Sequence, residues 1–349
     1  MGDKDKQISD LRSRVMWLDP IEGDEDFIKQ DETLVRYLKS RDWNVDEAEK
    51  MLKRTVEYRR QTRPMELECS WCHEKAGYHS MRQVGFDEVG RPVIYSNFSQ
   101  AAACRSTVED AIAHCTYLIE NAKRSMKPGI SSWVFIMDCT GMTMQACNPK
   151  LGYGVTQVMA NHYPERLGLV ICINHNPVFQ GVWRAMKLFL HPNTLAKMKL
   201  IRSKRKVVST FQKYFPDELV TWLREEIKLN KQKPLPTFQA EFWKRPSRKS
   251  DHDPRGCPSY VEQYLENYEG NTFSNKHSPH KPHPNIVDSI EGRLERTIVT
   301  QDEVVARLRA QEEAGRLDEM NSDAEDESAS EIEISKEFQI PKDASKLFT

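Results

Sequence analysis

The sequence predicts an α/β protein with a mostly parallel β-sheet that is covered by helices. Short apolar, β-branched runs alternate with longer segments whose apolar residues recur at helical spacing. The run from Gly168 to Asn174 is the clearest strand, and Pro177 can open an amphipathic helix directly after it. Because strands that alternate with helices form β-α-β units, we expect most of the strands to be parallel.

Composition limits the classes of protein that the chain can belong to. Its 349 residues suffice for one large or two small domains with extensions, and a net charge of −1 argues against a dedicated nucleic-acid binder. The eight cysteines lack the spacing of a disulfide framework, which is typical of a reducing cytosol. The N-terminus is polar, and no apolar run approaches the length of a membrane span. We therefore expect a cytoplasmic protein.

A helical subdomain over residues 31–66 follows a charged N-terminal extension over residues 1–30. Its first helix opens at Asp31 and its second at Asn44, an N-cap residue with Glu47 three positions later. Pro64 ends the second helix.

The main domain is expected over residues 77–230, where the apolar period changes repeatedly. The elements expected before Gly168 are two strands joined by a turn (82–86 and 91–95), a helix capped by Thr107, a strand from Trp133 to Asp138, and a helix ending at Pro164. After the amphipathic helix, residues 210–224 predict one or two further helical turns around Pro216.

The C-terminal third changes in character. Residues 231–284 hold eight of the eighteen prolines, which predicts an extended linker. Residues 285–349 predict one or two short helices, opened by a capping box at Thr300, and then an acidic disordered tail. Ser322, Ser328 and Ser330 lie among the acidic residues and are candidates for phosphorylation.

The sharpest short motif, Cys69-x-x-Cys72-His73, has the spacing of a haem-attachment site. Nothing targets the chain to a compartment where haem is attached. His79 could complete a zinc site with Cys69 and Cys72, but no second cysteine pair follows at zinc-finger spacing. We therefore expect two ordinary thiols, no metal and no cofactor. Phosphate-loop and nucleophile-elbow motifs are absent, so we expect a protein that is not an enzyme.

Four polar residues form a further candidate group: Arg59, Glu165, Thr194 and Lys197. Singly, each is explained by a helix end, a loop charge or a cap. As a set they suit a polyhydroxylated anionic headgroup, because cations hold phosphate and a carboxylate accepts hydroxyl hydrogens. Sequence spacing alone does not show that they converge.

The amphipathic helix carries a heavy apolar face of Phe179, Val182, Trp183, Met186 and Phe189. This face either packs on the core or forms a movable lid over an apolar cavity, and composition does not separate the two.

Several stretches resemble the CRAL-TRIO lipid-binding family, in the branch of the secretory phosphatidylinositol/phosphatidylcholine-transfer proteins. They are the L-x-R-Y-L-K-S-R-x-W stretch from Leu34, Tyr58-Arg59-Arg60, Gly90-Arg91-Pro92-Val93, Asp138 followed by Gly141, and Tyr163-Pro164-Glu165-Arg166-Leu167-Gly168. The resemblance implies a mostly parallel sheet floor, covering helices and an amphipathic gate helix that together enclose a lipid.

The same resemblance assigns roles to residues. Arg59, Glu165, Thr194 and Lys197 fall on the positions that hold the inositol-phosphate headgroup. The apolar face from Phe179 to Phe189 falls on the gate helix of the family. Trp133 and Phe135 occupy positions where phosphatidylcholine exchangers of the family carry small hydroxyl residues, which argues against that second ligand. Spacing of two along a strand places both aromatics on one face.

We therefore expect a lipid-transfer or lipid-presenting protein that binds one phosphatidylinositol and contacts membranes peripherally and transiently. Basic residues from Lys197 to Lys206 suit an anionic lipid surface, although a solvated face explains them equally well. We expect a monomer, with the C-terminal tail as a candidate site for a protein partner. The alternative is a binding module for a sterol, tocopherol, retinoid or haem, with a partner-recruiting tail.

Overall fold

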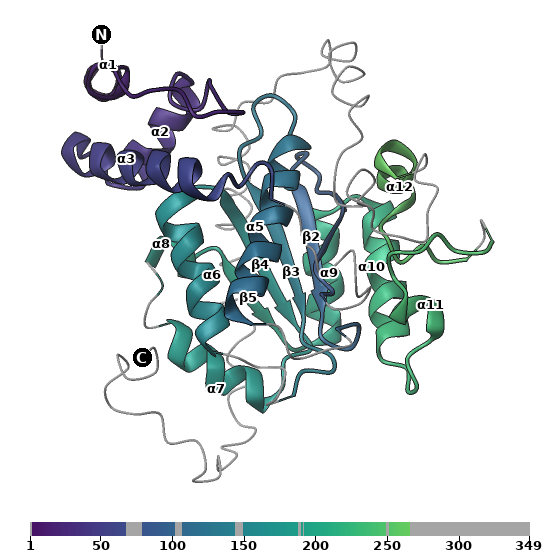
Figure 1. Ribbon diagram of the computed structural model, residues 1–349. Coiled ribbons are helices and arrows are strands. Elements are labelled where there is room, and N and C mark those ends of the chain that lie inside the picture. The colour runs from purple at the N-terminus through teal and green to yellow at the C-terminus, as the bar shows by residue number, and fades with distance from the viewer. Residues whose placement is uncertain are drawn as a thin grey trace.

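A five-stranded sheet lies at the centre of the computed structural model, with helices on both faces (Figure 1). The structure describes residues 2–67, 79–101, 107–143, 149–187, 190, 192–248 and 251–265. The strands follow in chain order across the sheet: β1 (Arg82–Phe86), β2 (Pro92–Asn97), β3 (Trp133–Asp138), β4 (Leu167–Ile173) and β5 (Met198–Ile201). Only β1 and β2 pair antiparallel, so the predicted mostly parallel sheet is confirmed.

The helices have the following bounds: α1 (Asp3–Val15), α2 (Asp31–Lys39), α3 (Val45–Thr62), α5 (Val108–Arg124), α6 (Pro149–His162), α7 (Pro177–Met186), α8 (Pro192–Leu195), α9 (Lys204–Tyr214), α10 (Asp217–Asn230), α11 (Thr237–Ala240) and α12 (Pro258–Tyr264). The predicted caps are confirmed: the Asn44 side chain accepts from the Glu47 N–H at 3.1 Å, and Thr107 accepts from the Asp110 N–H at 3.1 Å. Each cap satisfies a backbone donor that has no partner within the helix.

The charged N-terminal extension expected over residues 1–30 contains a helix that packs on the helical subdomain. Leu11 and Val15 of α1 lie four residues apart, on one side of the helix, and both are fully buried against α2 and α3. Leu34 and Leu52 belong to the same cluster. Charge dominates the composition of this segment, but two apolar positions at helical spacing suffice to dock it.

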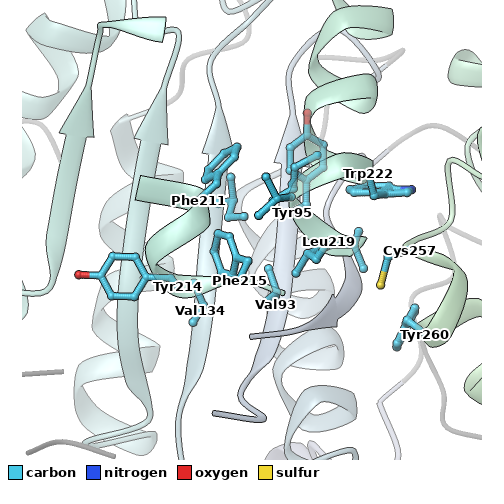
Figure 2. Close-up of a cluster of buried hydrophobic side chains, with 14 of the residues drawn as sticks. Val93, Tyr95, Val134, Phe211, Tyr214, Phe215, Leu219, Trp222, Cys257 and Tyr260 are labelled. Atoms are coloured by element: carbon cyan, nitrogen blue, oxygen red, sulfur yellow. The ribbon is translucent and has the colours of Figure 1, made fainter. Parts of the chain in front are cut away.

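The two faces of β3 carry different clusters because side chains alternate along a strand. Val134 and Ile136 face α9 and α10, where Phe211 and Leu219 complete a buried core (Figure 2). Trp133 and Phe135 face α5 and α6. Helix α9 begins at Lys204, before the predicted Thr210. Strand β5 was not predicted from the sequence, since it has only four residues.

The expected linker over residues 231–284 is wrong for its described part, which packs on the domain. Tyr260 and Tyr264 of α12 are buried beside Phe86 of β1, and the Cys257 N–H donates to the Val84 carbonyl at 2.9 Å. Prolines stop long helices here, but the aromatic residues between them bury enough apolar surface to fix the segment. Residues 266–284 lie outside the described part of the chain.

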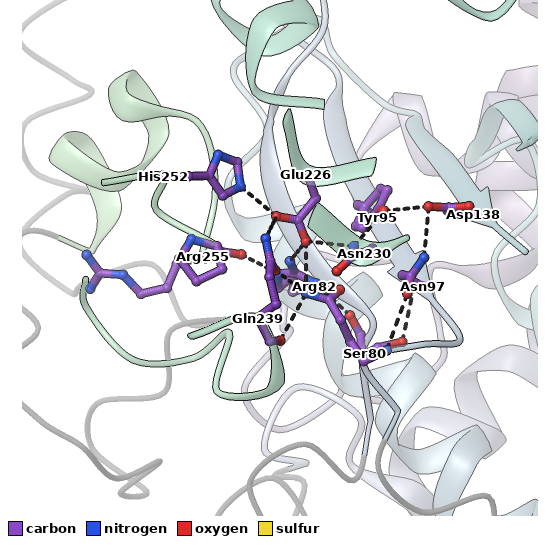
Figure 3. A network of polar contacts seen from close by, with 12 residues as sticks. Ser80, Arg82, Tyr95, Asn97, Asp138, Glu226, Asn230, Gln239, His252 and Arg255 are labelled. Atoms are coloured by element: carbon purple, nitrogen blue, oxygen red, sulfur yellow. Dashed lines mark hydrogen bonds and ion pairs between the residues drawn. The ribbon is translucent and has the colours of Figure 1, made fainter. Parts of the chain in front are cut away.

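A buried polar network fastens this segment to the sheet (Figure 3). The Glu226 carboxylate is fully buried and accepts from Arg82 at 2.8 Å, Gln239 at 3.0 Å and His252 at 2.6 Å. Burial alone would raise the pKa of Glu226, but Arg82 and His252 outweigh it and the pKa is lowered. The carboxylate therefore stays ionised and joins β1, α10 and residues 237–255.

Two of the sequence motifs meet at the start of β4. The Arg91 Nε donates to Asp87 at 2.6 Å, and the pair is buried. A Cβ on Gly168 would lie 2.7 Å from the Arg91 Nη1 and 2.9 Å from the Ser132 Oγ, so a larger residue would displace these side chains. Gly168 therefore leaves room for an arginine from the first hairpin to pack over it.

We predict that Glu226→Gln lowers the free energy of unfolding by about 3–5 kcal/mol, because it leaves Arg82 buried without a counter-charge. Urea unfolding of the full chain measures this. The control is the adjacent Glu225→Gln, which removes only a surface ion pair with Lys228 at 3.1 Å and should cost less than about 1 kcal/mol. Equal losses for the two variants would contradict the role of the network.

Candidate functional site

The most unusual feature of the sheet is an apolar surface that is only partly covered. Phe135 and Met137 lie on the central strand, yet both remain partly exposed, whereas the core side chains on the opposite face of β3 are buried. The central strand of a parallel sheet is ordinarily buried on both faces. Partly exposed apolar side chains from the neighbouring strands and α7 surround this pair: Leu167, Val178, Trp183, Met198 and Leu200. We call these seven residues the apolar face.

Helix α7 begins at one end of the apolar face, and its start is fixed. Asn176 is the N-cap, accepting from the Phe179 N–H at 3.0 Å, and its Nδ2 donates to the Met142 carbonyl at 2.8 Å. Phe179 is buried, and its ring lies parallel to Trp183 at a centroid distance of 6.5 Å. Phe179 therefore packs among apolar residues of the sheet, and Trp183 lies partly exposed beside it.

The other three residues of the predicted gate-helix face lie wholly or partly outside the described part of the chain. Val182 and Met186 lie on α7, but their side chains are outside the described part, as is the whole of Phe189.

The two aromatics predicted on one face of β3 have different surroundings. Trp133 is fully buried and packs edge-on against Tyr163 at 6.4 Å, beneath α5 and α6. Phe135 is half-buried and belongs to the apolar face. Trp133 therefore fills the space between sheet and helices at one end, and Phe135 borders the uncovered part.

Three of the four predicted headgroup residues lie together before β4 and β5. The Lys197 Nζ lies 3.3 Å from the Glu165 Oε2, and both side chains are about one-third exposed, at 29% and 30%. The Lys197 N–H donates to the Thr194 carbonyl at 3.1 Å, which places Thr194 one turn away. Glu165 has a positive φ of 57°, in a conformation that non-glycine residues rarely adopt. This group is accessible to a ligand from solvent.

The fourth predicted residue, Arg59, has other partners. Its guanidinium is buried and donates to Glu120 at 2.7 Å and to Asp24 at 2.6 Å. Lys123 and the Tyr163 hydroxyl complete the network, at 3.3 Å from Asp24 and 2.9 Å from Glu120. Among the described residues, no hydrogen bond or ion pair joins Arg59 to the group around Lys197. The network fastens α3 to α5.

The electrostatics of this network follow from its charges. Burial alone would raise the pKa of Glu120, but Lys123 and Arg59 outweigh it and lower the pKa to about 2. Sequence analysis missed Glu120, although it interrupts the apolar side of α5 next to Ile119, which is a usable signal. Asp24 lies in a loop, and no pattern in the sequence indicates its role.

The other motifs singled out in the sequence serve structure or lie elsewhere. Asp138 is fully buried and accepts from Tyr95 at 3.0 Å, Asn97 at 2.8 Å and Asn174 at 2.8 Å, so it ties three strand ends together. The part of the chain that the structure describes contains no group of three or more potential metal ligands. The motif from Cys69 to His73 lies outside it.

None of the described helices is both long enough and apolar enough to span a bilayer.

Comparison with known proteins identifies the family. The CRAL/TRIO domain matches residues 78–221, and the CRAL/TRIO N-terminal domain matches residues 8–54. Together these matches cover more than half of the chain, so the protein belongs to the CRAL/TRIO family. The match to the N-terminal domain includes the second part of α1, with Leu11 and Val15, which agrees with the packing of these two residues.

Relatives are distant. The CRAL-TRIO domain-containing protein C3H8.02 of Schizosaccharomyces pombe is 30% identical over 207 residues, 55% of this chain and 44% of that protein. The phosphatidylinositol/phosphatidylcholine transfer protein SFH13 of Arabidopsis thaliana is 25% identical over 192 residues, 49% of this chain and 31% of that protein. The matches thus span less than half the length of these two relatives. A crystal structure of Sfh5 aligns with a TM-score of 0.48 and 15% identity, over 57% of this chain and 81% of that one.

We predict that Glu120→Gln destabilises the protein by about 3–5 kcal/mol near neutral pH, because Arg59 and Lys123 lose a buried counter-charge. The folded-state pKa of Glu120 is depressed, so its contribution is present above the unfolded value of about 4.5 and is lost as the pH falls toward about 2. The difference in unfolding free energy between wild type and variant should therefore shrink over that range.

Urea titrations at several pH values test this, with the exposed Glu109→Gln on the same helix as control. A difference that stays constant from pH 7 to about pH 2 would contradict the assigned pKa.

Proposed function

We propose that this protein binds one phosphatidylinositol molecule, with its acyl chains against the apolar face, and exchanges it at membrane surfaces. The observation that carries the proposal is the partly exposed apolar surface on the central strand. Water in contact with such a surface is unfavourable by about 25 cal/mol for each Å². An apolar ligand that covers Phe135 and Met137 removes this cost, and membership of the CRAL/TRIO family supports a lipid as that ligand.

The proposed headgroup site is the group of Glu165, Thr194 and Lys197. The lysine attracts the lipid phosphate, and the carboxylate accepts hydrogen bonds from inositol hydroxyls. Both side chains are accessible, and their mutual contact of 3.3 Å is a weak surface pair that a ligand can replace.

Arg59 fits this site less directly than the resemblance implies. Its two terminal nitrogens already engage Glu120 and Asp24, and its Nε is buried, so a direct contact with the headgroup requires one of these ion pairs to break. The pair with Asp24 is the more accessible, since that side chain is 19% exposed against 2% for Glu120. We therefore propose that Arg59 reaches the headgroup only by exchanging Asp24 for phosphate.

Exchange requires an exit for the acyl chains, and we propose α7 as the gate. Each methylene that leaves for water costs about 0.8 kcal/mol, so the lipid must pass directly into a bilayer. Arg184 and Lys187 near the end of α7 are exposed, as are Lys204, Arg205 and Lys206. These cations suit a transient contact with anionic lipids.

We further propose that the protein is a cytoplasmic monomer without enzymatic activity. The four described free cysteines are buried, which suits a reducing compartment. The acidic tail over residues 312–333, proposed as the site of a protein partner, lies outside the described residues.

We predict that the double variant Lys197→Ala with Glu165→Ala transfers labelled phosphatidylinositol between vesicles at least about tenfold more slowly than wild type, since a lost charged contact to a phosphate is worth about 1.4 kcal/mol or more. The matched control is Lys228→Ala, which removes an exposed lysine of α10. Transfer of a sterol or retinoid by both proteins, with no transfer of phosphatidylinositol by wild type, would replace the proposal with the alternative of another hydrophobic ligand.

Phosphatidylcholine should not be transferred by wild type at a comparable rate. Trp133 is fully buried where a choline headgroup would need space, and neither Trp133 nor Phe135 offers a hydroxyl. The same vesicle assay with labelled phosphatidylcholine tests this, and equal rates for the two lipids would show that the aromatics do not select the headgroup.

A further inference from the structure

A small pocket lies where the N-terminal helices meet the lipid-binding domain, and its lining is strongly cationic. Four cationic side chains line it: Arg36, Arg59, Lys123 and Arg166. The pocket is small and partly open to solvent. The pocket therefore suits a small anionic group rather than a whole lipid.

Two of these cations have a carboxylate partner and two have none. Arg59 and Lys123 pair with Glu120 and Asp24. Arg36 and Arg166 form no ion pair with any carboxylate in the described ranges. Within the described part of the chain, Arg36 donates only to the Thr33 hydroxyl, at 2.9 Å. Arg166 donates to the Ser131 carbonyl at 2.9 Å and contacts the Met126 sulfur at 3.7 Å.

Arg36 is the more informative of the two because it is 96% buried, with only 4% of its surface exposed. An arginine in such a position ordinarily has a carboxylate partner, since an unpaired buried charge is costly. Glu120, which pairs with Arg59 and Lys123, has the largest carboxylate influence on Arg166, and the exposed Glu32 acts on both guanidiniums without forming an ion pair with either. Burial and then repulsion by Arg166 lower the pKa of Arg36 to about 9, which still leaves it charged near neutral pH.

The aromatic residues that line this pocket add no negative charge. Tyr37 and Tyr163 are buried, and burial and Arg59 lower the pKa of His162 to about 4, so it is neutral. Unpaired guanidinium groups in a small, partly dry pocket match the planar, bidentate recognition of phosphate oxygens.

We propose that Arg36 and Arg166 form a binding site for a phosphate monoester, which supplies the counter-charge that these two arginines lack and fastens the helical subdomain to the lipid-binding domain. A phosphate monoester carries about −1.5 to −2 charge and three acceptor oxygens near neutral pH, enough to bridge both guanidiniums. The group belongs either to the headgroup of a phosphorylated inositol lipid or to a free phosphate compound. The site does not depend on Glu165, Thr194 or Lys197 and goes beyond the proposed transfer of phosphatidylinositol.

The first test is thermal unfolding of the full chain in millimolar inorganic phosphate against chloride of equal ionic strength. Phosphate should raise the unfolding midpoint by about 3 °C or more, because a ligand that binds only the folded state stabilises it. Arg36→Met and Arg166→Met should abolish this shift, and the exposed Arg54→Met on α3 should retain it. No shift in wild type, or the same shift in all four proteins, would overturn the proposal.

The unfolding temperatures of the same variants are also compared in chloride without phosphate. If Arg36 is an uncompensated buried charge, Arg36→Met should unfold at the same temperature as wild type or higher. A lower midpoint would show that Arg36 stabilises the fold without an anion, and would also overturn the proposal.

A second comparison separates the sources of the phosphate and separates this site from the headgroup site. Uptake of phosphatidylinositol 4-phosphate from vesicles that depends on Arg36 would assign the phosphate to a lipid. Stabilisation by soluble inositol phosphates, without such uptake, would assign it to a free compound. The double variant of Lys197 and Glu165 should keep the phosphate-induced shift, so loss of lipid transfer and loss of the phosphate site are distinguishable.

Discussion

The central strand of a parallel sheet is ordinarily buried on both faces, and here two large apolar side chains on one face stay partly exposed. Val134 and Ile136 point into a closed core formed with α9 and α10. Phe135 and Met137, which alternate with them, remain partly exposed beside α7. A sequence that places large apolar side chains on an open face gains stability only when something apolar lies against them. The fold therefore presents an apolar surface that the proposed lipid would cover.

Buried ion pairs hold the parts around this face in place. Arg59 with Glu120 joins α3 to α5, Arg82 with Glu226 joins β1 to α10 and the segment after it, and Arg91 with Asp87 braces the first hairpin over β4. Buried pairs contribute little net stability compared with apolar replacements, because both charges must leave water. Their value here is geometrical: each pair joins segments that are distant in the chain or fixes a turn, and breaking one leaves a charge without a partner.

Much of the fold could be predicted from the sequence, because many of its elements are determined by residues that are neighbours in the chain. The caps at Asn44 and Thr107 and the apolar run of β4 each depend on a few neighbouring residues. The errors came from long-range packing. Leu11 and Val15 are two apolar residues in a charged stretch, and residues 237–265 are rich in proline, yet both segments are fixed by contacts with distant parts of the chain.

The site was predictable in part for the same reason. Glu165 and Lys197 precede adjacent parallel strands, so the topology brings them within 3.3 Å. Arg59 was grouped with them by resemblance, but its partners Asp24 and Glu120 come from a loop and from the covered side of α5, and no pattern in the sequence indicates that pairing. The absence of a carboxylate beside Arg36 likewise becomes visible only when its neighbours are placed, so that inference belongs to the structure alone.

Native mass spectrometry of the full chain purified from a eukaryotic host tests the central claim most directly. If an apolar ligand covers the open face of the sheet, the protein should carry one bound lipid, released on unfolding and identified as phosphatidylinositol. A protein that carries no lipid, and takes none from vesicles, would contradict the claim that the apolar face exists to be covered. A single sterol or isoprenoid in its place would keep that claim and refute the inositol-lipid assignment.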